Sequence, residues 1–152
     1  MTGPARTFAA SAHLSGLLSL TGRLAQERIG RQLAALGLSY ARAAALVRLW
    51  RHDGPMPQTE MIRSLALSRA SGTLVLNQLE QQGLIERRPV LGDARRVMLE
   101  LTPAGRDLER PVLEIIERVE SALRARLTDE EVATSFRVLV SVLETLRSER
   151  EA

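Results

Sequence analysis

The strongest constraint on the fold is a change in hydrophobic period at Gly83. Before this glycine, apolar residues recur at the three- and four-residue spacing of helices. After it, residues 84–87 and 97–101 alternate as strands do, and they flank a loop, residues 88–96, that is rich in Arg, Gly and Pro. The pattern therefore predicts helices followed by a β-hairpin.

The helical part before Gly83 ends in two short helices with a break near Leu67. Ser68 is the expected N-cap of the second of these helices, and Gly83 is expected to close it. One side of that helix is apolar or small and should face inward: Gly72, Val75, Leu76 and Leu79. Two short helices joined by a tight connection and followed by a hairpin predict a winged helix-turn-helix.

Longer helices are expected on both sides of this unit. Residues 5–36 form a long helix ended by Gly37, and Ser39 caps a helix to about His52. The turn of residues 53–57 contains two prolines and precedes the helix-turn-helix.

After the hairpin, Thr102 and Pro103 start one continuous helix to about Leu123. Thr128 and Glu131 have the spacing of a capping box for a last helix. That helix is expected to bury Phe136, Leu139, Val140, Leu143 and Leu146. The predicted fold class is mainly α: a winged helix-turn-helix with a small β-hairpin wing.

The amino-acid composition excludes several kinds of chemical site. All 21 basic residues are Arg, the chain has no Cys and only two His, and its formal net charge is +3. Disulfides, thiolate zinc sites and cysteine redox sensing are excluded, and neither a metal nor a cofactor is expected. No catalytic motif is visible, so an enzyme is not expected. Without a membrane-spanning apolar stretch or a secretory leader, the protein is expected to be cytoplasmic, with no membrane partner.

Three short motifs carry a family resemblance. They are Leu79-Glu80-Gln81-Gln82-Gly83-Leu84-Ile85-Glu86-Arg87, Asp93-Ala94-Arg95 and Leu101-Thr102-Pro103-Ala104-Gly105. In this order and spacing, they resemble the MarR family of winged helix-turn-helix regulators. The resemblance implies a homodimer that binds a palindromic double-stranded DNA site. The expected function is a sequence-specific DNA-binding transcription regulator, a repressor whose binding a small-molecule ligand could relieve.

The resemblance also implies a domain organisation. Residues 1–152 would form one MarR-type domain, with residues 1–36 and 103–152 as N- and C-terminal dimerisation helices and residues 39–101 as the DNA-binding region. Apolar stripes on thin terminal helices have little core of their own to cover, which favours a partner chain.

The DNA-contacting residues are expected on two elements. The outward face of the second short helix supplies Ser68, Arg69, Ser71, Thr73, Leu74, Asn77 and Gln78. The wing supplies Arg87, Arg88, Asp93, Arg95 and Arg96. By resemblance, Arg95 enters the minor groove and Asp93 orients it, while the other arginines contact phosphates.

Two residues of the second helix depart from the family pattern, and they bear on DNA affinity. Leu74 stands where relatives often carry Arg, and Gly72 stands where relatives often carry a bulkier apolar residue.

A small aromatic or phenolic effector, if there is one, would contact His13, Arg42, Trp50 and His52. Two alternatives remain open: a winged-helix dimer that has lost specific DNA binding and serves as a ligand- or protein-binding module, and an architectural DNA binder with little sequence preference.

Overall fold

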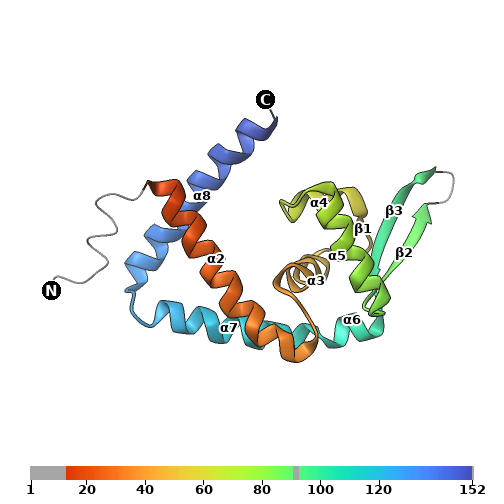
Figure 1. Cartoon of the computed structure of the whole chain (residues 1–152), viewed down its shortest axis with the longest axis horizontal. Helices are drawn as coiled ribbons and strands as arrows, with labels where there is room; N and C mark the ends of the chain where they lie inside the picture. Colours follow the sequence, from red (N-terminus) through yellow and green to blue (C-terminus); the bar gives the residue numbers. More distant parts are fainter. Residues whose placement is uncertain (1–12, 91–92, 152) are drawn as a thin grey trace. The chain divides into compact units, whose positions relative to one another are not determined.

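The computed structural model describes residues 13–90 and 93–151, without the side chains of residues 93–95 and 149–151. The chain divides into two compact units, Met1–Ile115 and Ile116–Ala152, and each is described by itself. Figure 1 shows the elements in order along the chain. As the sequence predicts, the described residues are mainly helical with a small sheet.

The first unit contains two helices, and the first begins later than predicted: His13 has an extended backbone with a φ of -60° and a ψ of 140°, so the helix does not run continuously from residue 5, and residues 5–12 of the expected helix lie outside the described residues. Helix α2 (Leu14–Leu33) continues as one turn of 3-10 helix, η1 (Ala34–Leu36), and Gly37 ends it with a φ of +69°. Glycine suits this position because it lacks the Cβ that makes positive φ unfavourable. Helix α3 (Tyr40–Arg51) begins at Ser39, whose side chain accepts a hydrogen bond from the backbone N–H of Arg42. The expected stop at Gly37 and the expected cap at Ser39 are confirmed.

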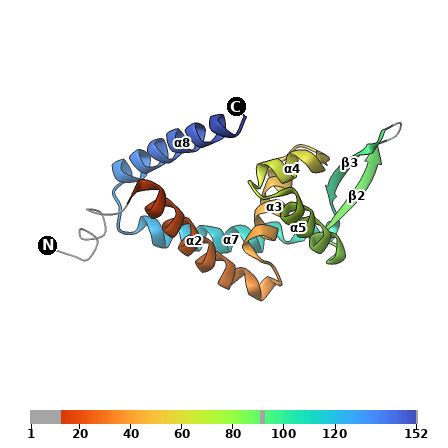
Figure 2. The ribbon, with the colours of Figure 1, turned by 45° about the horizontal axis from the view of Figure 1, so that its top comes forward.

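The helix-turn-helix consists of α4 (Gln58–Ser64) and α5 (Arg69–Gln81). Between them, Ala66 adopts a left-handed conformation with a φ of +54°. Arg48 of α3 supports this corner by donating hydrogen bonds to the carbonyl oxygens of Ser64 (2.9 Å) and Ala44 (2.8 Å). Figure 2 shows α3, α4 and α5 grouped beside the hairpin.

The described strands form an antiparallel sheet in the order β1-β3-β2: β1 (Met56–Pro57), β2 (Ile85–Val90) and β3 (Asp93–Leu101). The predicted hairpin is confirmed, with two corrections. Met56 and Pro57 are not part of a turn but pair with Leu99 and Met98 of β3. The strands also extend into the segment predicted as a loop, because pairing continues from Arg88↔Met98 to Val90↔Asp93 across a register shift.

After the sheet, the predicted continuous helix is interrupted. The chain forms α6 (Pro103–Asp107) and then α7 (Glu109–Arg124), with the break at Leu108. Pro111 gives the physical reason, since it has no N–H to donate to a preceding turn and therefore suits the first turn of a new helix. The cap is as predicted: the Thr102 side chain accepts a hydrogen bond from the backbone N–H of Gly105.

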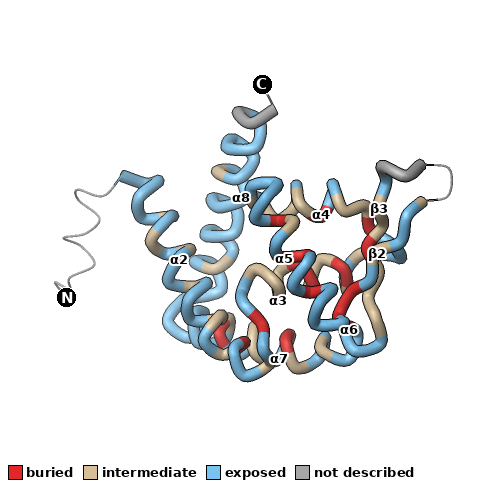
Figure 3. The backbone as a smooth tube through the Cα atoms, turned by 45° about the vertical axis from the view of Figure 1, so that its right-hand side comes forward, coloured by how far each residue is buried: buried red, intermediate tan, exposed pale blue. Residues whose placement is uncertain are grey.

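The core of the first unit joins helices and sheet. Its fully buried side chains include Leu33, Leu46, Met61, Leu76, Leu79, Ile85 and Leu99. Figure 3 shows buried residues (red) along α3, α5 and the strands. This core supports the inner face of α5 and leaves its other face to solvent.

The second unit contains the end of α7 and helix α8 (Asp129–Glu151). The predicted capping box is confirmed: the Thr128 N–H donates to Glu131 Oε2 at 2.8 Å, and the Glu131 N–H donates to Thr128 Oγ1 at 3.2 Å. The predicted burial of the apolar face is wrong for the single chain, because a unit of two helices has no further layer to cover it. Between 46% and 56% of each side chain is exposed at Phe136, Leu139, Val140, Leu143 and Leu146.

In the part of the chain that the structure describes, no single helix has the length and apolar composition of a membrane span. The helix pair Leu14–Leu36 and Tyr40–Arg51, bent by 81°, meets those two criteria only when it is taken together.

Candidate nucleic-acid interface

Helix α5 begins with a side-chain cap. The backbone N–H of Ser71 donates to Ser68 Oγ at 3.1 Å, and the Ser68 hydroxyl donates to Ser71 Oγ at 2.9 Å. Serine is favoured here because its oxygen accepts from one of the unpaired N–H groups of the first turn. Both Ser68 hydrogen bonds are therefore internal, while the Ser71 hydroxyl keeps its own proton to donate.

The two faces of α5 differ as the sequence predicts. Its inward residues, Gly72, Val75, Leu76 and Leu79, are all buried. Gly72 lies so close to α4 that a Cβ on it would meet Ile62 Cγ2 at 2.9 Å. Its departure from the family pattern therefore concerns the packing of α4 on α5 and not the outward face.

The outward face of α5 carries the candidate base-contacting residues. Ala70, Leu74, Asn77 and Gln78 are exposed, and Thr73 is half-buried. The Thr73 hydroxyl donates to the carbonyl oxygen of Arg69 at 2.8 Å, so Thr73 offers DNA its methyl group and acceptor lone pairs. Leu74 is 58% exposed. The middle of this face is therefore apolar, and an apolar side chain in the major groove fits the methyl group of thymine.

Arg87 lies at the centre of a polar network that joins three elements. From β2, it donates through Nε to Gln58 Oε1 of α4 at 2.8 Å and through Nη2 to Asn77 Oδ1 of α5 at 2.8 Å. It also forms an ion pair with Glu80 at the end of α5. Only 20% of its side chain is exposed, so its guanidinium is directed toward these partners.

The sequence identified Arg87 and Asn77 only as separate DNA contacts and missed Gln58 and Glu80. One signal was available, since Glu80 and Arg87 both belong to the first family motif. They lie seven residues apart around the turn at Gly83. A helix end followed by a tight turn and a strand brings residues at such a spacing together.

The wing arginines fall into different environments. Arg88 pairs with Glu86 at 2.7 Å and with Glu100 at 3.3 Å. The hydrogen bond that Arg88 donates to Glu86, and then the negative charges of Glu100 and Glu86, raise the pKa of Arg88. Arg96 is exposed, and the side chains of Asp93 and Arg95 lie outside the described residues. Glu86 and Glu100 thus compete with DNA phosphates for Arg88.

The four candidate effector residues have different surroundings in the single chain. His13 is exposed at the start of α2, and Arg42 Nε donates to the Ser39 hydroxyl at 3.3 Å. The Trp50 indole N–H donates to the carbonyl oxygen of Gly105 at 3.1 Å, which joins α3 to α6. His52 lines a cavity of about 340 Å³, together with Leu49, Gly54, Pro55, Glu100, Leu101 and Arg106. His13, Arg42 and Trp50 do not line this cavity.

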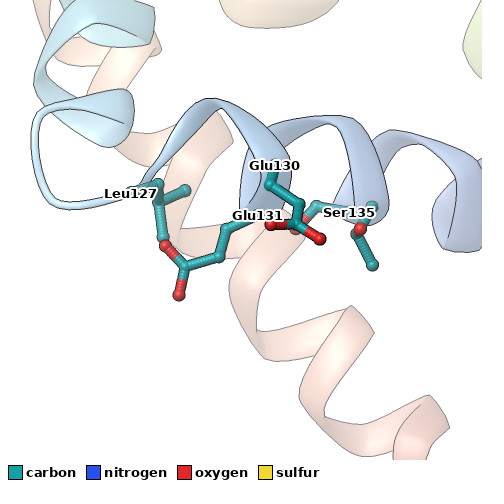
Figure 4. Close-up of a pocket in the computed structure, with 5 residues that line it drawn as sticks. Leu127, Glu130, Glu131 and Ser135 are labelled. Carbon is teal, nitrogen blue, oxygen red and sulfur yellow. The ribbon is translucent and has the colours of Figure 1, made fainter.

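A second hollow, of about 400 Å³, lies at the start of α8 and is lined by Leu127, Glu130, Glu131, Thr134 and Ser135 (Figure 4). The Glu131 carboxylate accepts from both the N–H and the hydroxyl of Thr128, so it serves the helix cap. Across the described residues, no group of three or more His, Cys, Asp or Glu side chains is arranged to hold a metal ion.

The fold and the exposed face of α5 define a winged-helix DNA-binding protein. The family model described as MarR family matches residues 38–97. The chain is 30% identical over 114 residues to the organic hydroperoxide resistance transcriptional regulator of Bacillus subtilis (strain 168), which covers 75% of this chain and 76% of that protein. The chain belongs to the MarR family: it is a DNA-binding transcription regulator and not an enzyme.

Two further comparisons concern a curated relative and a solved structure. The chain is 33% identical over 88 residues to the transcriptional repressor MprA of Escherichia coli (strain K12), spanning 57% of this chain and 50% of that protein. The solved S. aureus MepR–DNA complex has a TM-score of 0.81 and 22% identity, and the match covers 90% of this chain and 99% of that one. This last likeness supports the fold.

Proposed function

We propose that the chain is a cytoplasmic repressor that binds a palindromic operator as a homodimer, with α5 of each copy in the major groove. This proposal rests mainly on the outward face of α5, where Leu74, Asn77 and Gln78 are exposed while the inner face is buried. A helix supported from behind in this way can enter a groove without disturbing the core. The likeness to the repressor MprA favours repression.

Gel-shift titrations on DNA from upstream of the chain's own gene, at two salt concentrations, test this proposal. A sequence-specific repressor binds that DNA more tightly than random duplex at both concentrations. An architectural binder loses that difference, because its affinity comes from phosphate contacts that salt weakens on every sequence alike. A winged-helix module without DNA binding shifts neither duplex.

In this proposal, Arg95 enters the minor groove and Asp93 orients it. We expect Arg95→Ala to weaken binding strongly on the natural site and less on a site with G·C-rich flanks, because a narrow A·T-rich minor groove attracts Arg. The matched control is Arg88→Ala, which should weaken binding to all sequences alike. Because Arg88 is paired with Glu86 and Glu100 in the free chain, its loss should be the smaller one. An Arg95→Ala variant that binds the operator as tightly as the wild type contradicts the wing contact.

The proposed homodimer is supported by the apolar face of α8. Phe136, Leu139 and Leu143 are each about half exposed in the single chain. A row of large apolar side chains along one helix is costly in water, and a second copy of the same chain is a natural cover for it. Two copies would also present two α5 helices to the two halves of a palindrome.

A small-molecule effector is the second candidate function. The cavity beside His52 favours it, because Leu49 and Leu101 supply apolar walls, while Arg106 supplies a cation that suits a phenolate or carboxylate. Since the chain contains no Cys, such a signal would act by binding and not by thiol oxidation. Titration of salicylate into the operator complex tests this: His52→Ala and Arg106→Ala should abolish any release of DNA that salicylate causes in the wild type.

A further inference from the structure

The Arg87 network fixes which way the amide group of Asn77 points. A guanidinium has only donors, so the Asn77 atom that lies 2.8 Å from Arg87 Nη2 is the amide oxygen, Oδ1. The amide NH₂ group is therefore the end left for other partners. Asn77 is exposed and stands on the outward face of α5, one turn after Thr73 and Leu74.

The orientation of Arg87 is itself determined by several partners. Gln58 accepts from its Nε at 2.8 Å, and the Glu80 carboxylate pairs with Nη1. These two groups come from different helices, and together with Asn77 they account for three of the five N–H donors of the guanidinium. Several simultaneous bonds to one planar group leave it little rotational freedom, so the Asn77 amide is held as well.

An asparagine whose side-chain amide has a fixed orientation can contact different bases from one whose amide can rotate. A free asparagine can bind adenine with both ends of its amide, since adenine offers the N7 acceptor and the N6 donor side by side. Here Arg87 occupies one acceptor position of Oδ1, and its positive charge repels a further donor hydrogen. The NH₂ group remains available, and guanine is the base that offers two adjacent acceptors, N7 and O6, in the major groove.

We propose that Arg87 is a positioning residue that makes Asn77 a donor-only reader, so that the base selected at the Asn77 position of each half-site is guanine and not adenine. This inference rests on the proposed entry of α5 into the major groove. It replaces the expected phosphate contact of Arg87 with an indirect part in base selection.

Selection of binding sites from a random-sequence duplex library by the full-length chain tests this proposal. In the wild type, the position that loses its base preference in Asn77→Ala should favour guanine. Arg87→Met frees Oδ1, so the guanine-over-adenine ratio at that position should fall about tenfold, within the range of one bidentate contact. Preferences at the other positions should stay unchanged. Arg88→Met is the matched control, because Arg88 lies on the same strand but pairs with Glu86 and Glu100.

Asn77→Asp provides a second variant that keeps an acceptor facing Arg87 and so preserves the network. Its outward oxygen can only accept, so the preferred base should change from guanine to cytosine, whose N4 group donates. Three outcomes would overturn the inference: adenine at the wild-type position, an Arg87→Met effect spread evenly over all positions, or no change of base in Asn77→Asp. A wild type that selects no sequence would instead overturn the proposed base contacts and this inference together.

Discussion

At the scale of single residues, several side chains have roles that depend on partners far away in the sequence. Ser68, Ser39 and Thr102 cap helices through local hydrogen bonds, and the sequence predicts all three. Arg87 is different, because its partners Gln58 and Asn77 are 29 and 10 residues away. Spacing rules for helices and strands cover only near neighbours, so the network needs the folded chain to be recognised.

Gly105 illustrates why the third family motif ends in glycine. A Cβ at this position would lie 2.0 Å from the carbonyl oxygen of Leu84, which is rigid backbone. We expect Gly105→Ala to lower the free energy of unfolding by about 2 kcal/mol or more, since either α6 or the backbone just before β2 must shift. Urea denaturation measures this. Gly16→Ala is the control, because nothing lies within 4 Å of its Cβ, and it should leave stability unchanged or raise it.

Ala66 adopts an unfavourable backbone conformation in the turn between α4 and α5. Its φ of +54° is unfavourable for a residue with a Cβ. Ala66→Gly should therefore raise the free energy of unfolding by about 0.5–1 kcal/mol, the strain relieved less the extra entropy of glycine in the unfolded chain. Ala70→Gly, inside α5, should have the opposite sign. Thermal unfolding measures the stability of both variants relative to the wild type. An Ala66→Gly variant that is less stable than the wild type would show that the turn is not strained.

At the scale of whole elements, the helices follow their sequence signals closely. Caps, glycine stops and apolar spacing correctly predict α3, α5 and α8, because each signal acts within one or two turns. The break at Leu108 is an error over a local signal, Pro111, whereas the errors in the sheet arise from distant partners. Strand β1 has two residues and no periodicity, and it exists because Met56 pairs with Leu99. Continued pairing in the same way carries β2 through Pro89 to Val90.

The start of α8 should depend on pH through its capping box. The backbone N–H of Thr128, and then its hydroxyl, lower the pKa of Glu131, because both donate to the ionised carboxylate. A lowered pKa in the folded chain means that Glu131 stabilises α8 at pH values above the pKa it has in the unfolded chain. That contribution disappears as the pH falls through the folded-state pKa.

Circular dichroism from pH 7 down to pH 3 tests the role of this cap. The wild type should lose helicity on acidification, and Glu131→Ala should start lower and change less. Glu130→Ala, one residue earlier, should titrate like the wild type. Equal acid profiles for all three chains would mean that the capping box does not stabilise the helix.

At the scale of the whole molecule, the described single chain lacks a cover for the apolar face of α8. Leu139→Glu introduces a charge into that face, and it should change the mass measured by light scattering from twice 16.8 kDa to 16.8 kDa. Ser141→Glu is the control, since two residues along a helix correspond to rotation by about 200° and thus to the other side. A wild type that is monomeric at micromolar concentration would contradict the proposed homodimer.

Strand β3 pairs with β1 on one edge and with β2 on the other. In the sequence, α4 and α5 lie between β1 and β2. The helix-turn-helix is thus an insert between two strands that both pair with β3. Substitutions can change the outward residues of α5 while its four inward residues, and the pairing of β1 and β2 with β3, are retained. The specificity of such a regulator can therefore diverge after gene duplication in few steps, without passing through unfolded intermediates.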